Sequence, residues 1–173
     1  MSRYLEFLED YHRQEPRRIE EILDVRREVA RALAPLDGRS RIEARLKSPT
    51  STWRKMMRYG LAHDEVHDLI GLRVIVGRVE QCYEALELLR EGLPGIWDRF
   101  KDYIARPKSN GYQSLHICAR LHSGPIFEIQ IRTRAMHRRC TTGVAAHDRY
   151  KRLGAGDLAP SRSLARTRVD MAS

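Results

Sequence analysis

The sequence has few cysteines and no long uncharged apolar run. Only 3 cysteines occur among 173 residues, they lie far apart, and no CxxC pair is present. A disulfide framework or a thiolate zinc site is therefore not expected, and the thiols are predicted to be reduced and buried. No apolar stretch reaches the ~20 residues that a membrane helix needs, and the charged residues that follow Met1 argue against a signal peptide. We expect a cytoplasmic protein with no membrane contact.

The common nucleotide-binding fingerprints are also absent, since neither GxxxxGK[ST] nor GxGxxG occurs. The chain nevertheless has 32 Lys and Arg against 23 Asp and Glu, a formal net charge of +9. Such an excess favours polyanionic partners, namely nucleotides, RNA or anionic lipid. The dense charges of residues 17–27, including Arg17, Arg18, Arg26 and Arg27, are interpreted as a solvated helix face, with a nucleic-acid surface as the less favoured alternative.

Apolar periodicity predicts an α+β domain. Leu5, Leu8 and Tyr11 begin a helical stripe that Pro16 should break or kink. The remaining signals predict a mixed, mainly antiparallel five-stranded sheet flanked by helices, with the last three strands in a meander. Helices are expected at residues 4–36, 48–60, 80–91 and 133–151, and strands at 41–47, 72–76, 97–104, 114–121 and 126–131. Residues 1–40 are assigned to an N-terminal helical segment, 41–153 to a core, and 154–173 to a flexible basic tail.

Strand alternation gathers polar side chains on one face of this sheet. Cations beside a carboxylate and a histidine suit phosphate binding with a metal and a general base. A merely solvated sheet face is the alternative. The residues expected on this face are Arg45, Lys47, His116, Glu128, Gln130 and Arg132.

Two further segments bear on function. The loop over residues 99–112 is rich in cations, and Tyr112, just after Gly111, can stack on a nucleotide base. His63 and His67 have the four-residue spacing of helical zinc ligands. Because Asp64 stands where such motifs carry Glu, and no third ligand is evident, we favour two exposed histidines over a metal pair.

Six blocks resemble the RelA/SpoT-type (p)ppGpp synthetase domain, and they follow in order between about residues 41 and 151, a span that makes up most of the chain. They include RLKSPTSTWRKM, HDLIGLR and KSNGYQSLH, which begin at Arg45, His67 and Lys108. The other three blocks are residues 99–104, 127–133 and 143–147. The resemblance implies a nucleotidyltransferase-like fold and transfer of the β,γ-pyrophosphate of ATP to the 3′-hydroxyl of GDP or GTP, with Mg²⁺ as cofactor.

The resemblance also assigns roles to residues. Asp68 and Glu128 match the catalytic, magnesium-binding carboxylates. The positions that match donor ATP contacts are Arg45, Lys47, Ser51, Lys55 and Arg73. The positions that match acceptor contacts are Lys101, Lys108, Asn110, Tyr112, His116 and Gln130. The segment from Arg99 to Asp102 resembles the RxKD loop that accompanies a GDP preference.

Two alternatives stay open. A toxin-type small synthetase would pyrophosphorylate the 3′ end of tRNA or an adenine nucleotide instead, and the net charge of +9 is compatible with RNA. A non-catalytic nucleotide- or RNA-binding regulator is the other alternative. The length favours a small, stand-alone synthetase, for which a homo-oligomer or an antitoxin are candidate partners.

Overall fold

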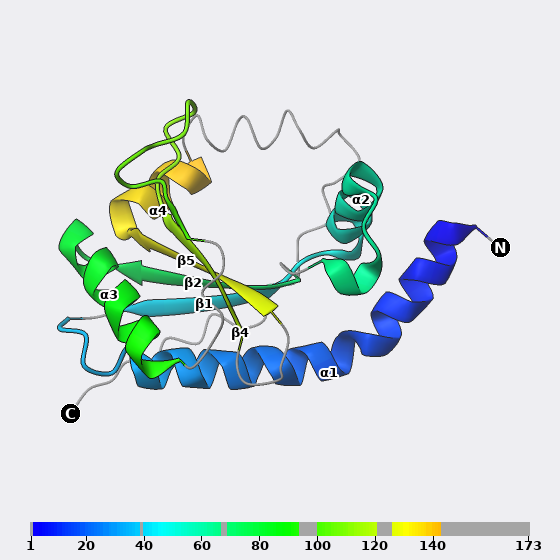
Figure 1. The fold of residues 1–173 in the computed structure, drawn as a ribbon, viewed down its shortest axis with the longest axis horizontal. Coiled ribbons are helices and arrows are strands. Elements are labelled where there is room, and N and C mark those ends of the chain that lie inside the picture. The colour runs from blue at the N-terminus through cyan, green and yellow to red at the C-terminus, as the bar shows by residue number, and fades with distance from the viewer. Residues whose placement is uncertain (1, 39, 67–68, 94–99, 121–125, 143–173) are drawn as a thin grey trace.

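The computed structural model describes residues 2–38, 40–66, 69–93, 100–120 and 126–142, in which helices surround one sheet (Figure 1). The predicted tail at 154–173 lies outside these residues. The elements are α1 (Arg3–Ala32), β1 (Arg41–Leu46), α2 (Pro49–Tyr59), the short 3₁₀ helix η1 (His63–Glu65), β2 (Ile70–Val76), α3 (Val79–Gly92), β3 (Lys101–Asp102), β4 (Leu115–Arg120), β5 (Ile126–Thr133) and α4 (Arg134–Thr142).

The sheet has five strands in the order β1-β2-β5-β4-β3. All neighbouring strands are antiparallel except β2 and β5, which run parallel. The α+β class, the mixed sheet and the β3-β4-β5 meander are thus confirmed. The strand predicted at 97–104 ends early, because Asp102 Oδ1 accepts hydrogen bonds from the backbone amides of Ile104 and Ala105 at 2.9 Å each and starts a turn.

Helices α1 and α3 cover the apolar face of the sheet, where alternate residues of β2, β4 and β5 are almost fully buried. Pro16 lies inside α1, which stays continuous but bends (Figure 1). Of the two outcomes predicted for Pro16, a break or a kink, the bend of a continuous helix agrees with the kink. Leu5 is half exposed and Phe7 is buried in its place, so the first turns of the helix face the other elements differently from the prediction.

The N-terminal part of α1 packs on α2 rather than on the sheet (Figure 1). Phe7 and Tyr11 form a second apolar cluster there with Met56 and Val66. Helix α2 has the predicted ends: the Ser48 hydroxyl accepts from the Ser51 amide at 3.3 Å, and Gly60 closes the helix with φ of 63°. This second cluster fixes α2 beyond the end of β1.

The structure differs from two predictions about side-chain burial. Arg18 is 8% exposed and belongs to the buried stripe of α1, so it is not part of a solvated face. The cysteines are free, as expected, but only Cys82 is buried, while Cys118 and Cys140 are partly exposed. Burial raises the pKa of Cys82 to about 12. Within the described ranges, no helix is long and apolar enough to cross a membrane.

Candidate active site

The polar face of the sheet lies opposite α1 and α3, and strand pairing orders its side chains in rows. One row runs from Arg45 through Gly71 to Glu128 and Cys118. The next row runs across all five strands, from β1 to β3: Glu43, Arg73, Gln130, His116 and Lys101. This register confirms the predicted convergence for Arg45, His116, Glu128 and Gln130, whereas Lys47 lies just beyond the end of β1.

Glu128 is held by two neighbouring side chains. Its Oε1 lies 2.8 Å from His116 Nδ1, and its Oε2 accepts from Gln130 Nε2 at 3.1 Å. The Nε2 of His116 lies 2.7 Å from the hydroxyl of Tyr112. Burial raises the pKa of Tyr112, so the phenol keeps its proton. The result is a continuous hydrogen-bonded series from Tyr112 to Gln130, with the carboxylate in its centre.

The loop before β4 presents the aromatic side of the site. Asn110 accepts the Tyr112 amide through its side chain at 3.1 Å, and Gly111 adopts φ of 75°. The Lys108 ammonium lies 4.5 Å from the ring centroid of Tyr103 and 5.2 Å from that of Tyr112. Tyr103 was not predicted as a site residue, although it lies among the cations of the same loop in the sequence.

Arg45 lies over Gly71 in the middle of the polar face. A Cβ on Gly71 would stand 3.6 Å from both Cγ and Nε of Arg45. The absence of a side chain at position 71 therefore leaves room between Arg45 on one strand and Glu128 on another.

Lys47 and Ser51 lie at the start of α2, and Lys55 lies one helical turn after Ser51. The first turn of a helix carries amides without intrahelical partners, and its dipole favours anions. The Ser48 hydroxyl donates to that of Ser51 at 2.9 Å, so both are ordered at this end. This arrangement suits phosphate groups beside Arg45.

A group of arginines lies at the far end of the polar face, under α4. Arg73 donates to Glu43 at 2.8 Å, and Arg41 also contacts Glu43. Arg132 was expected on the open face but is 3% exposed, since α4 covers it. Burial, and then the charge of Arg73, lower the pKa of Arg132.

His137 of α4 completes this group. Its pKa is lowered to about 4 by burial and by the nearby charges of Arg132, Arg73 and Arg41. Neither Glu43, Arg41 nor His137 was singled out from sequence, because their proximity depends on the pairing of β1 with β2 and on the packing of α4.

Some of the remaining predicted site residues lie outside the described part of the chain, and others lie within it. Asp68, Arg99 and His67 lie outside the described residues. Lys101 is exposed on β3, opposite His116.

His63 is not the exposed histidine that we expected: its side chain is 16% exposed and its ring nitrogens contact Arg18 and Asp10. No three His, Cys, Asp or Glu side chains in the described part of the chain gather as a metal site.

Comparison with known families agrees with this geometry. The family model described as "Region found in RelA / SpoT proteins" matches residues 44–155. The chain therefore belongs to this family. It is 38% identical over 136 residues to the bifunctional (p)ppGpp synthase/hydrolase RelA of Mycobacterium tuberculosis, which covers 79% of this chain and 18% of the relative. It is 46% identical over 110 residues to the probable chloroplastic GTP diphosphokinase RSH3 of Oryza sativa, covering 64% of this chain and 16% of the relative. The chain thus spans less than a fifth of these relatives.

Solved structures of similar length share the fold. A GTP pyrophosphokinase family protein from Streptococcus pneumoniae superposes with a TM-score of 0.67 and 26% identity, covering 83% of this chain and 78% of that one. Small alarmone synthetase 1 from Bacillus subtilis, bound to its product pppGpp, superposes with a TM-score of 0.65 and 25% identity, covering 83% and 82%.

Proposed function

We propose that this chain transfers the β,γ-pyrophosphate of ATP to the 3′-hydroxyl of GDP or GTP, which forms (p)ppGpp and AMP. The observation that carries the proposal is Glu128, held by His116 and Gln130 on a sheet face with Arg45 on one side and Tyr112 on the other. The names of the relatives and the product bound to the Bacillus structure support the same reaction.

Glu128 has a defined task in this reaction. A ribose hydroxyl is a weak nucleophile near neutral pH, so a carboxylate within hydrogen-bond reach assists by taking its proton. His116 and Gln130 fix the orientation of the carboxylate, and this restricts it to one approach. Tyr112 and Lys108 would hold the acceptor base, while Asn110 shapes the loop that presents them.

The donor would lie across β1, Gly71 and the start of α2. The guanidinium planes of Arg45 and Arg73 suit stacking on a purine, and Lys47, Ser51 and Lys55 suit the phosphates. Pyrophosphoryl transfer depends mainly on positioning and on neutralising charge, which these fixed cations provide.

Mg²⁺ fits the donor atoms of the site. Glu128 supplies carboxylate oxygen, the ligand type that Mg²⁺ prefers, and it stands beside the space over Gly71. With Asp68, which precedes β2 by two residues, Glu128 would hold the ion. When bound, Mg²⁺ supplies charge neutralisation for the phosphates.

A label-transfer assay tests the proposal. Purified protein, Mg²⁺ and ATP labelled at the γ-phosphate are offered GDP, GTP, ADP or bulk tRNA in separate reactions, with EDTA as the metal control. We expect label to appear on GDP or GTP and to be lost with EDTA. Label on tRNA or ADP alone would replace the proposed acceptor, and no transfer to any acceptor would contradict catalysis.

A further inference from the structure

Tyr11 connects α1 to the segment that we assign to the donor. The side chain is 2% exposed, and its hydroxyl donates to the main-chain carbonyl of Lys47, immediately before the Ser48 cap of α2. Burial raises the pKa of Tyr11 to about 12, so the hydroxyl remains a donor. The contact spans 36 positions in sequence, and α1 ends before the family match begins at residue 44.

The backbone of Lys47 is fixed from a second side as well. Its amide donates to the carbonyl of Leu69 at 2.8 Å. Leu69 directly follows Asp68, the predicted metal ligand. One residue, Lys47, is therefore bonded through its carbonyl to α1 and through its amide to the residue next to Asp68.

The ring of Tyr11 is held in turn by charged and aromatic neighbours. The Arg18 guanidinium lies 5.1 Å from the ring centroid, and the His63 ring lies nearly parallel at 6.0 Å. Phe7 packs on the ring at 5.8 Å. These contacts hold the ring of Tyr11, whose hydroxyl donates to the carbonyl of Lys47.

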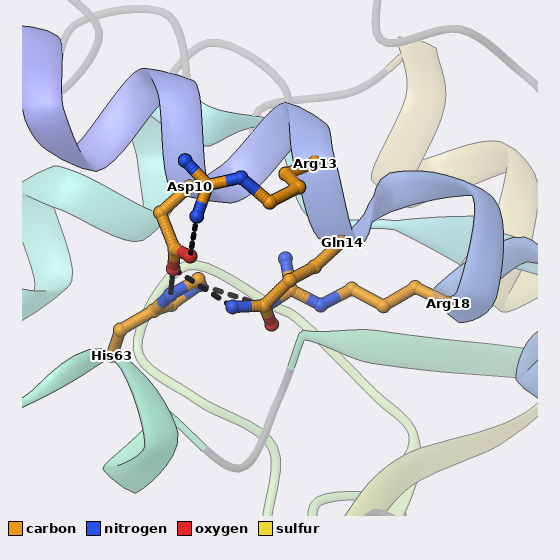
Figure 2. Close-up of polar contacts among 5 residues, drawn as sticks. All are labelled: Asp10, Arg13, Gln14, Arg18 and His63. Atoms are coloured by element: carbon orange, nitrogen blue, oxygen red, sulfur yellow. Dashed lines mark hydrogen bonds and ion pairs between the residues drawn. The ribbon is translucent and has the colours of Figure 1, made fainter.

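Figure 2 shows how Arg18 and His63 are ordered. Arg18 contacts His63 Nε2 at 3.1 Å and donates to Gln14 at 2.7 Å, while His63 Nδ1 lies 3.3 Å from Asp10. A guanidinium only donates, so Nε2 accepts and Nδ1 carries the proton toward Asp10. Burial disfavours the charged form of Arg18 and so lowers its pKa. Keeping a charged arginine buried therefore costs free energy of folding, which its partners must offset.

We propose that Tyr11 is a positioning residue for donor binding, which fixes the main chain at Lys47. This proposal rests on the proposed function, since Lys47 is assigned there to the donor phosphates. Tyr11 touches no substrate in this account. It acts by removing conformational freedom from the Lys47 backbone before ATP arrives, so its loss raises the cost of binding the donor.

The variant Tyr11→Phe tests this, because it deletes one hydroxyl and keeps the ring between Arg18 and His63. Tyr59→Phe, at a 63% exposed position at the end of α2, makes the same chemical change as a control. We expect Tyr11→Phe to raise the KM for ATP roughly five-fold, the effect of one ordinary hydrogen bond, with the KM for GDP and kcat little changed. The control should match the parent protein.

Two measurements do not need turnover. Amide hydrogen exchange at Lys47 should speed up in Tyr11→Phe while the strands of the sheet stay protected. The Kd for α,β-methylene-ATP with Mg²⁺ should weaken by the same factor as KM. Faster exchange with an unchanged Kd would overturn the proposal, as would equal losses for both substrates accompanied by a lower Tm. If the parent protein transfers no label, the proposed function fails, and exchange and analogue binding still decide the role of Tyr11.

Discussion

His116 and Glu128 lie on neighbouring antiparallel strands, two residues out of register, with Nδ1 and Oε1 2.8 Å apart. For a neutral imidazole, Nδ1–H donates to the carboxylate and Nε2 accepts from the Tyr112 hydroxyl at 2.7 Å. The histidine therefore orients Glu128 and connects it to the aromatic residue assigned to the acceptor. The proposed base and the proposed acceptor contact thus form one hydrogen-bonded unit.

Glu128→Gln removes the charge from this unit with little change in shape. We expect kcat for (p)ppGpp formation to fall at least about 100-fold, in the range found for a lost general base. Glu84→Gln, an exposed change on α3, is the control, and circular dichroism with thermal unfolding checks the fold. Activity within a few-fold of the parent protein would refute the role of Glu128.

Gly71 offers a steric test of the space between Arg45 and Glu128. A Cβ there meets Arg45 at ordinary contact distance, so Gly71→Ala should fold with an unchanged or slightly higher Tm. The added atoms occupy the donor region, so we expect the KM for ATP to rise, more for Gly71→Val than for Gly71→Ala, with the KM for GDP less affected. A rise in the KM for GDP alone would mean that the donor and acceptor sides of the site are assigned the wrong way round.

Glu128 and Gly71 differ in how far the sequence alone predicts their surroundings. Alternation has a period of two regardless of the neighbouring strands, so Glu128 and Gln130 could be placed on the polar face without a structure. The neighbours of Gly71 depend on the pairing of β2 with β1 and with β5, and no local pattern records these registers. The same holds for Glu43, which contacts Arg73 on the neighbouring strand.

The burial of Arg18 could not be predicted from the sequence, for a different reason. It follows Tyr11 by seven residues and precedes Ile22 by four, so helical spacing places it on the buried stripe. Its charge nevertheless favours a solvated face, because buried arginines are rare unless they have partners. Those partners, above all His63, come from 45 positions away, and only the fold brings them together.

Tyr112 should affect the acceptor and not the donor. Tyr112→Ala removes a stacking surface worth about 1–3 kcal/mol, so we expect the KM for GDP to rise roughly ten-fold or more. Tyr112→Phe keeps the ring and loses the contacts of the hydroxyl, chiefly that with His116, so its effect on KM should be smaller. Steady-state kinetics with each substrate varied separately measure this. A larger change in the KM for ATP than for GDP would contradict the assignment.

Arg132 should contribute little to stability, despite being buried. Its Nε has no hydrogen-bond partner, and within the described residues no carboxylate pairs with it, although its side chain hydrogen-bonds to Cys140. Replacing a buried charge that has no ion-pair partner with an apolar side chain removes the cost of desolvating that charge. We therefore expect Arg132→Met to keep or raise the Tm, with exposed Arg106→Met as the control. A fall of more than about 2 kcal/mol in the free energy of unfolding would show that the contacts of Arg132, including the one with Cys140, outweigh the cost of burying its charge.

His137 makes the stability of the protein depend on pH in a defined window. Its native pKa of about 4 lies below the ordinary value of 6.5, so the unfolded chain binds the extra proton first as pH falls. His137 therefore adds stability above pH 6.5, and this contribution is lost progressively down to about pH 4. Urea unfolding of His137→Gln should show a smaller loss of stability than the parent protein between pH 7 and about pH 4.

The direct check is the ring proton shift of His137, followed by NMR from pH 7 to pH 3.5. We expect a midpoint near 4, because protonation would place a charge on a buried ring beside Arg132, Arg73 and Arg41. Arg132→Met should raise this midpoint, since among the three arginines Arg132 lowers the pKa of His137 most. A midpoint near 6.5 in the parent protein would mean that α4 does not bury His137 against the arginines.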